Sequence, residues 1–165
     1  MRAPFSSRHP NGPSRVGRRE VLRLFAALPA VAVVTSACAG GEDAPDPLAA
    51  LATAARSDAA LAQGVARTHR ALGAEAGAVA EIRSEHARLL QREIDRLDPP
   101  DEPRRHPAPA VQVPGSADAA KTELKRALAL AEQSAAKLCP TLPGYRSGLT
   151  GSVSASCASL AEVLA

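Results

Sequence analysis

The sequence predicts an all-α protein, a four-helix bundle made of two helical hairpins that a long, proline-rich segment joins. Apolar residues recur every three or four positions in four stretches of the chain, as they do along one face of an α-helix. Proline or glycine follows each of the first three stretches, and both residues are typical of helix ends. Alanine, the best helix former, is abundant in all four.

The first hairpin is expected between residue 47 and the prolines at 99 and 100. Asp46-Pro47 is typical of a helix start, because the carboxylate can cap the first turn and proline lacks an N–H that is not needed there. The first apolar face runs to a break near Gly73 and contains Leu48, Leu51, Ala55, Ala62, Val65 and Leu72. The second face begins near residue 74 and contains Val79, Ile82, His86, Leu90, Ile94 and Leu97.

Residues 99–115 contain six prolines, so we expect an extended surface connection rather than a helix. Ser116 can cap a third helix that ends before Pro140 and Pro143-Gly144. The apolar faces of the third and fourth helices contain Ala120, Leu124, Leu128, Ala131, Ala135 and Leu138, and then Leu149, Val153, Cys157, Leu160 and Leu164. Two hairpins joined by one long crossover is the topology of ferritin-like bundles.

Residues 1–37 are predicted to be a signal peptide. Six arginines precede the apolar run 24–34, which ends in small residues before Cys38. This run is too short for a transmembrane helix, which needs about 20 residues. Around Arg18 and Arg19 the chain resembles the twin-arginine export motif, although Gly17 and Val21 depart from the usual pattern. A general secretory signal is the alternative.

The segment Val34-Thr35-Ser36-Ala37-Cys38 resembles a bacterial lipobox. This resemblance implies that the Cys38 thiol is acylated with diacylglycerol and that Cys38 becomes the new N-terminus, so the membrane is a partner through this lipid. Thr35 departs from the usual Leu or Val, and an ordinary signal peptidase would instead release a freely secreted protein. Residues 38–46 are expected to be a flexible tether, and residues 47–165 the folded domain.

Positive charge is concentrated in the predicted signal peptide. The whole chain has a net charge of +3, but residues 1–37 contain six arginines and one acid, which leaves 14 basic and 16 acidic residues, a net charge of −2, in the remainder. Tyr145 is the only aromatic residue after Cys38. Because binding to nucleic acid relies on clustered positive charge and on aromatic stacking, we expect no nucleic-acid partner.

The predicted domain has no recognisable catalytic or metal-binding pattern. A di-iron bundle needs Glu-x-x-His, whereas His86 directly follows Glu85 and so points elsewhere. His86 is expected to be a hydrogen-bonded core residue, and Glu81 and Glu85 a solvated face with Arg88 and Arg92. There is no nucleophile elbow, no phosphate-binding loop and no cysteine with a recognisable histidine partner. We therefore predict no catalytic residue, metal or cofactor.

Cys139 and Cys157 leave two interpretations open. An even pair of cysteines in an exported domain suggests a disulfide. Helix geometry opposes it, because Cys157 lies about 20 Å along the fourth helix from the preceding turn, and bridged Cα atoms must lie within about 7 Å. Two buried thiols are the alternative.

In overall layout the chain resembles small, alanine-rich, twin-arginine-exported lipoproteins of actinobacteria with ferritin-like domains. The resemblance rests on the leader, the four-helix plan, the segment 143–159 and an excess of arginine over lysine, 17 to 3. It implies the architecture and transfers no catalytic residue. We expect a non-catalytic binding or scaffold protein, lipid-anchored at the outer face of the cytoplasmic membrane. The alternative is a ferritin-like metal-binding or oxidoreductase protein with atypical ligands.

Overall fold

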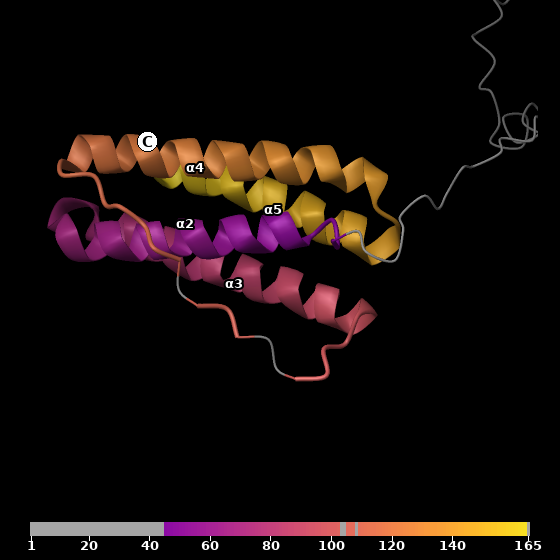
Figure 1. Cartoon of the computed structure of the whole chain (residues 1–165). Coiled ribbons are helices and arrows are strands. Elements are labelled where there is room, and N and C mark those ends of the chain that lie inside the picture. The colour runs from indigo at the N-terminus through magenta and orange to yellow at the C-terminus, as the bar shows by residue number, and fades with distance from the viewer. Residues whose placement is uncertain (1–44, 103–104, 108, 165) are drawn as a thin grey trace, which may run out of the picture. The chain divides into compact units, whose positions relative to one another are not determined.

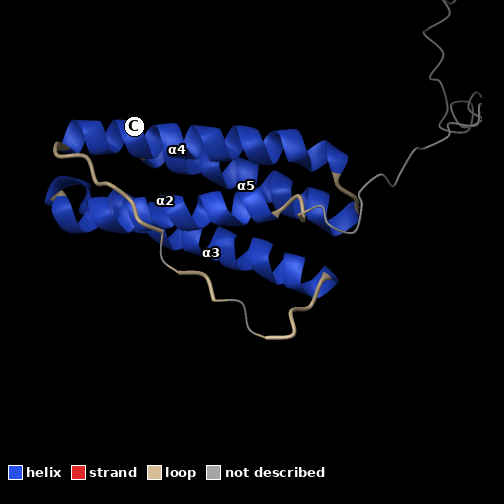
Figure 2. Ribbon diagram, viewed as in Figure 1, coloured by secondary structure: helices blue, strands red, loops and turns tan. Residues whose placement is uncertain are grey.

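A computed structural model of the chain describes residues 45–102, 105–107 and 109–164. The predicted export signal at Arg18 and Arg19 and the predicted lipidation site at Cys38 lie outside these residues. The described part contains four α-helices and no strand (Figure 2), which confirms the prediction of an all-α protein. No helix of this part has both the length and the apolar character that a membrane span requires.

The four helices agree closely with the predicted ranges. Ser116 caps α4 as predicted, because its hydroxyl oxygen accepts a hydrogen bond from the Ala119 N–H at 3.2 Å. Before α2, the Asp46 carboxylate accepts one from the Leu48 N–H at 2.7 Å, and the helix begins two residues later than expected. Gly144 opens α5 with a φ of +48°, which glycine adopts at little cost. The helices are α2 (Ala49–Thr68), α3 (Gly73–Leu97), α4 (Ala117–Leu138) and α5 (Gly144–Val163), with short 3-10 helices η2 (Arg70–Leu72) and η3 (Cys139–Thr141) in the two hairpin turns.

The two hairpins, α2–α3 and α4–α5, pack side by side (Figure 1). His69, just after α2, donates a hydrogen bond from Nε2 to the carbonyl oxygen of Pro114, just before α4, at 2.8 Å. At the other end, Arg146 at the start of α5 pairs with Asp46 before α2. The segment between α3 and α4 therefore returns along the bundle, and α3 and α4 run in the same direction.

The core is built from leucine, alanine and valine, and most of the predicted inward positions are buried. Two predictions on α3 are wrong: Ile82 is 36% exposed and Leu97 is 51% exposed. Arg83 lies inward instead. The buried positions of α3 include 76, 79, 83, 86, 90 and 94. Residues 82 and 83 both fit a spacing of three or four, but successive residues point about 100° apart around a helix, and residue 83 is the one that faces the core. Leu97 belongs to the last turn of α3, where the helix ends.

Candidate functional site: a groove between α2 and α4

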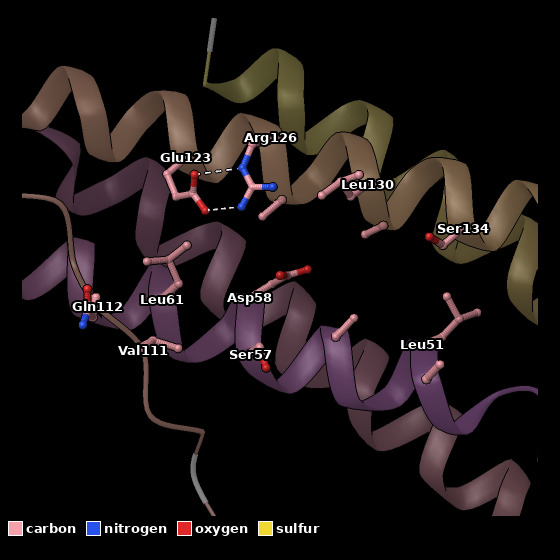
Figure 3. A pocket seen from close by; sticks show the side chains of 14 residues that line it. Leu51, Ser57, Asp58, Leu61, Val111, Gln112, Glu123, Arg126, Leu130 and Ser134 are labelled. Carbon is pink, nitrogen blue, oxygen red and sulfur yellow. Dashed lines mark hydrogen bonds and ion pairs between the residues drawn. The ribbon is translucent and has the colours of Figure 1, made fainter. Parts of the chain in front are cut away.

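A groove separates α2 from α4, and the loop that precedes α4 closes one of its ends (Figure 3). Its volume of about 640 Å³ falls within the range of small-molecule sites, about 300–1,000 Å³. We call it the α2–α4 groove. The residues labelled in Figure 3 define it: Leu51, Ser57, Asp58 and Leu61 from α2, Glu123, Arg126, Leu130 and Ser134 from α4, and Val111 and Gln112 from the loop.

The charged side chains of the groove gather toward one end, which we call the polar half although Leu61 and Val111 also lie there. The other end, which we call the apolar half, contains one polar side chain, Ser134, among those labelled. Asp58, Glu123 and Arg126 lie together toward the end that the loop closes, whereas Leu51 and Leu130 lie toward the other end. Leu130 is 50% exposed although it is a large apolar residue. Removing apolar surface from water is favourable. A ligand that covers Leu130 with an apolar group would therefore be stabilised by the burial of both surfaces.

On the α4 side, Arg126 and Glu123 form an ion pair at the rim. Arg126 Nε donates to Glu123 Oε2 at 2.9 Å, and Nη2 donates to Oε1 at 2.5 Å. The hydrogen bonds from Arg126 hold the pKa of Glu123 below its ordinary value. Glu123 and Arg126 are thus both ionised near neutral pH, and they form the α4 side of the polar half of the groove.

On the α2 side, Asp58 connects the groove to the interior of the bundle. Its Oδ2 accepts hydrogen bonds from Arg83 Nε at 3.1 Å and from Arg83 Nη2 at 2.7 Å. The Arg83 side chain is 1% exposed, whereas that of Asp58 is 16% exposed. Burial raises the pKa of the Asp58 carboxyl, and the Arg83 guanidinium opposes this shift. The buried positive charge of Arg83 needs a partner of opposite sign, and the Asp58 carboxylate is that partner.

Arg83 also brings His86 and Cys157 together, a juxtaposition that the sequence analysis missed. Arg83 Nη1 donates to His86 Nδ1 at 3.0 Å and to Cys157 Sγ at 3.4 Å. Since arginine only donates, the neutral His86 ring carries its proton on Nε2. The prediction of a hydrogen-bonded core histidine is confirmed, because His86 is 7% exposed. The signal was present in the sequence, since Arg83 and Asp58 both fit the inward spacing of their helices.

The electrostatics of this cluster do not resemble those of a catalytic cysteine. Burial lowers the pKa of His86 to about 4, and burial raises the pKa of the Cys157 thiol. Both groups are therefore neutral near pH 7, whereas a nucleophilic cysteine needs a lowered pKa. We conclude that Asp58, Arg83, His86 and Cys157, the Arg83 network, hold α2, α3 and α5 together.

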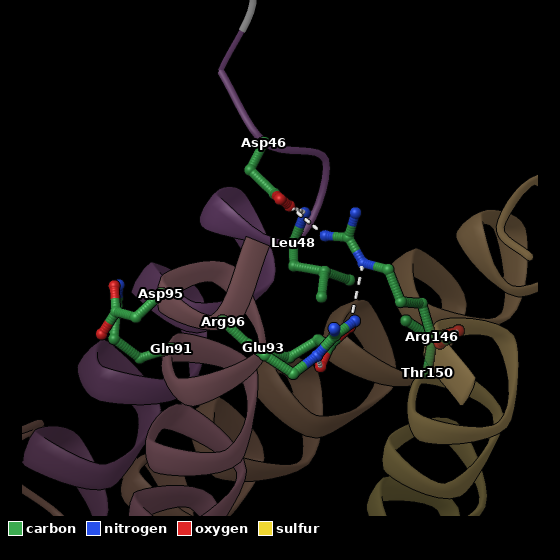
Figure 4. Close-up of polar contacts among 8 residues, drawn as sticks. All are labelled: Asp46, Leu48, Gln91, Glu93, Asp95, Arg96, Arg146 and Thr150. Atoms are coloured by element: carbon green, nitrogen blue, oxygen red, sulfur yellow. Dashed lines mark hydrogen bonds and ion pairs between the residues drawn. The ribbon is translucent and has the colours of Figure 1, made fainter. Parts of the chain in front are cut away.

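A second polar cluster ties the helix ends at the opposite end of the bundle from the loop–α4 junction (Figure 4). Arg146 pairs with Asp46, and its Nε lies 3.9 Å from Glu93 Oε1. Glu93 accepts hydrogen bonds from Arg96 Nε at 2.8 Å and Nη2 at 2.9 Å, which hold the pKa of Glu93 below its ordinary value. These contacts join the beginnings of α2 and α5 to the end of α3. Asp46, placed in the predicted tether, thus contacts the bundle directly.

The two cysteines are free thiols in the structure. Cys139 is half-buried in η3, and its Sγ donates to the Ser147 carbonyl oxygen at 3.3 Å. Cys157 is buried in the Arg83 network. The structure therefore has the arrangement of two separate thiols, one of the two interpretations that the sequence left open.

The remaining predicted groups lie on the surface or pair with arginine. Glu85 forms an ion pair with Arg88 on an exposed face, as the sequence predicts. Within residues 45–102, 105–107 and 109–164, no group of three or more His, Cys, Asp or Glu side chains could hold a metal ion. The Asp58 and His86 side chains are both hydrogen-bonded to the Arg83 guanidinium.

Comparison of this chain with protein-family models, with curated proteins and with solved structures finds no match. Its function is therefore inferred from its own geometry. Arg83, His86 and Cys157 are buried, and the cluster around Glu93 and Arg146 connects helix ends. The α2–α4 groove is open and combines apolar surface with a few polar groups, which is the character of a ligand site.

Proposed function

We propose that the chain is an exported, lipid-anchored helical binding protein without catalytic activity, held at the outer face of the cytoplasmic membrane, and that its ligand site is the α2–α4 groove. The observation that carries the proposal is the groove itself, in which exposed Leu130 and the edge of buried Leu51 adjoin a compact set of charged side chains. Buried apolar area supplies affinity in such a site, and the polar groups supply orientation.

The export and anchoring part of the proposal is supported by the leader alone. The arginine pair at 18 and 19, the apolar run after it and the small residues before Cys38 have the order of a lipoprotein signal. Seven residues separate Cys38 from Asp46, and a chain of this length spans about 26 Å at most. An anchor at Cys38 would therefore keep the groove within a few nanometres of the membrane.

A binding role without catalysis is supported by the chemistry of the site. The serines that line the groove, Ser57 and Ser134, form no hydrogen bond with a histidine of the described part of the chain. The histidine and the thiol of the Arg83 network are buried and neutral, away from the groove lining. Nothing in the polar half thus resembles a nucleophile with an adjacent base.

The ferritin-like assignment of the bundle belongs to the same proposal. It is supported by the crossover between α3 and α4 and by the shared direction of these two helices. The alternative of a metal-binding or oxidoreductase protein has less support, because the Arg83 guanidinium lies between Asp58 and His86 and would repel a cation there. Stoichiometric iron, manganese or zinc in the purified domain would favour the alternative.

Anchoring is tested by the intact mass of the protein from membrane and soluble fractions. We expect a chain that starts at Cys38 and carries a diacylglycerol-sized increment, found in the membrane fraction. Cys38→Ala is expected to abolish the increment and the membrane association. An unmodified, soluble wild-type product would contradict the anchor and leave a freely secreted protein.

Binding in the groove is tested with an uncharged fluorescent apolar probe, N-phenyl-1-naphthylamine. Ala127 lines the groove and Ala136 is an exposed residue of the same helix outside it. Ala127→Trp is expected to fill the groove and weaken probe binding at least about tenfold, whereas Ala136→Trp leaves it unchanged. Equal affinity in both variants would contradict this site.

A further inference from the structure

The four charged groups in and beneath the polar half of the groove balance. Asp58 and Glu123 contribute two negative charges, and Arg83 and Arg126 contribute two positive charges. Each acid is hydrogen-bonded to one arginine through short contacts. A charged ligand that enters this half therefore finds no side chain of opposite charge that is not already paired.

Two hydrogen-bonding atoms of this set remain open toward the groove. Both hydrogen bonds that Arg83 donates to Asp58 go to Oδ2, and Asp58 Oδ1 accepts none within the described residues. Arg126 uses Nε and Nη2 for Glu123, so that its Nη1 donates none there. Figure 3 shows the Asp58 carboxylate and the Arg126 guanidinium between the two helices. The site thus offers one acceptor and one donor to a single ligand head.

A charged head would be disfavoured in this environment. A carboxylate head would face the carboxylates of Asp58 and Glu123, and an ammonium head would face the guanidinium groups of Arg83 and Arg126. Either head would lose hydration without gaining a free counter-ion. An uncharged head that both donates and accepts satisfies Oδ1 and Nη1 together and leaves the charge balance unchanged.

The size of the groove limits the rest of the ligand. The lining residues of α2 extend from Ala50 to Leu61, which corresponds to about 16 Å along the helix axis. The volume of about 640 Å³ suits a small molecule better than a partner helix, which is itself about 10 Å across. A narrow, elongated molecule with one polar end fits both limits.

We propose that the α2–α4 groove selects amphiphiles with a single apolar chain and an uncharged head that donates and accepts hydrogen bonds, such as a primary amide or a hydroxyl. The head lies between Asp58 and Arg126, and the chain lies along Leu51 and Leu130. This inference rests on the proposed function of the groove as the ligand site. It adds the chemical class of the ligand.

The test uses three probes with the same alkyl chain, decanamide, decanoate and decylammonium, titrated calorimetrically below their micelle concentrations. We expect decanamide to bind about tenfold more tightly than either charged probe, because each charged head leaves its hydration unreplaced. Ala127→Trp and Ala136→Trp, measured with decanamide, separate the groove from other apolar surface.

Two variants on α4 change the charge balance without removing a hydrogen bond of the Arg83 network. Glu123→Gln leaves an excess positive charge and is expected to shift the ratio of decanoate to decylammonium affinity about tenfold toward decanoate. Arg126→Gln is expected to shift it by a similar factor toward decylammonium. Glu85→Gln, which makes the same charge change on α3, is expected to leave the ratio unchanged.

Each outcome separates the two proposals. Loss of all binding in Ala127→Trp, together with the decanamide preference, supports both. Tighter binding of a charged probe to the wild type, blocked by Ala127→Trp, would overturn the uncharged head and keep the groove as the ligand site. Binding that Ala127→Trp does not affect would overturn the groove itself and, with it, the inference.

Discussion

Helix α2 meets its two neighbours in different ways. Toward α3 it packs closely, and the seam encloses the Asp58–Arg83 ion pair. Toward α4 it contacts its neighbour less extensively and leaves the groove. Among the described residues, every buried side-chain nitrogen and oxygen atom of α2 and α3 has a hydrogen-bond partner, whereas the groove side offers open hydrogen-bonding atoms. Stability is therefore concentrated on one side of α2 and the capacity to bind on the other.

Asp58 belongs to both sides, and this explains how a charged residue can serve the groove. Its Oδ2 is fixed by two hydrogen bonds from Arg83, whose side chain cannot move because it is buried. Its Oδ1 is thereby held in one place beside the groove. A carboxylate positioned in this way loses little conformational entropy when it binds a ligand.

The largest expected effect comes from removing the shared residue. Asp58→Ala leaves Arg83 charged and buried without its partner, so we expect the free energy of unfolding in urea to fall by about 3–5 kcal/mol. Replacing both residues, Asp58→Leu with Arg83→Met, is expected to recover most of the loss. If Asp58→Ala lowered stability no more than Glu85→Ala, a substitution at an exposed position, the packing of α2 against α3, which we call the closed seam, would not depend on the Asp58–Arg83 pair.

The seam between α2 and α3 also predicts a pH dependence of stability that comes from His86. The pKa of His86 is about 4 in the folded protein and about 6.5 in an unfolded chain. Between these values the unfolded state binds more protons. Stability is therefore complete above about pH 6.5 and falls by up to about 3 kcal/mol as the pH decreases to about 4.

The control for this prediction is His86→Gln, whose amide oxygen can accept from Arg83 but does not titrate. Asp58 and Cys157 are common to both proteins, so their titration cancels in the difference. Urea unfolding between about pH 7 and about pH 4.5 should show a flatter dependence in the variant. Parallel curves would mean that His86 is accessible to protons in the folded state.

On the groove side, the close approach of the crossover loop to α2 predicts a smaller effect. A Cβ atom at Gly64 would lie 2.5 Å from Val113 Cγ2. Gly64→Ala gains about 1 kcal/mol of helix propensity but forces a stiff, β-branched side chain to move, so we expect a net loss of about 1 kcal/mol. Because Val111 and Gln112 line the groove, probe binding should weaken as well.

A second substitution reverses the sign of this effect. In a Val113→Ala background the clash is removed, and Gly64→Ala is then expected to stabilise the protein by up to about 1 kcal/mol. Thermal or urea unfolding of the four proteins measures the coupling between the two positions. Additive effects would show that the loop does not rest on α2 at Gly64.

The sequence predicted the helices well because their signals are local. Ser116 caps α4, and prolines follow the ends of α3 and α4 where the pattern stops. The Arg83 network escaped prediction because Arg83 adjoins Ile82, and apolar character alone selects Ile82 for the core. Only the presence of Asp58 on the facing helix makes burial of the arginine favourable.

The groove and the cluster around Arg146 depend on contacts between residues far apart in the chain. Arg146 pairs with Asp46, 100 residues earlier, and no periodicity reports such a pair. The groove exists because α2 and α4 lie further apart than α2 and α3, and spacing between helices is set by all side chains of the interface together. The inward face of each helix could largely be predicted from the sequence, but the distance between neighbouring helices could not.

The smallest expected effect concerns the two cysteines, one at a helix-end turn and one in the closed network. Because both are free thiols, dithiothreitol is expected to leave the urea midpoint of unfolding unchanged. Iodoacetamide should modify half-buried Cys139 before Cys157, whose burial keeps it protonated and inaccessible. A loss of about 2–4 kcal/mol on reduction would instead reveal a disulfide. That result would also require Cys157 to leave Arg83, and the closed seam would then contain an unpaired donor.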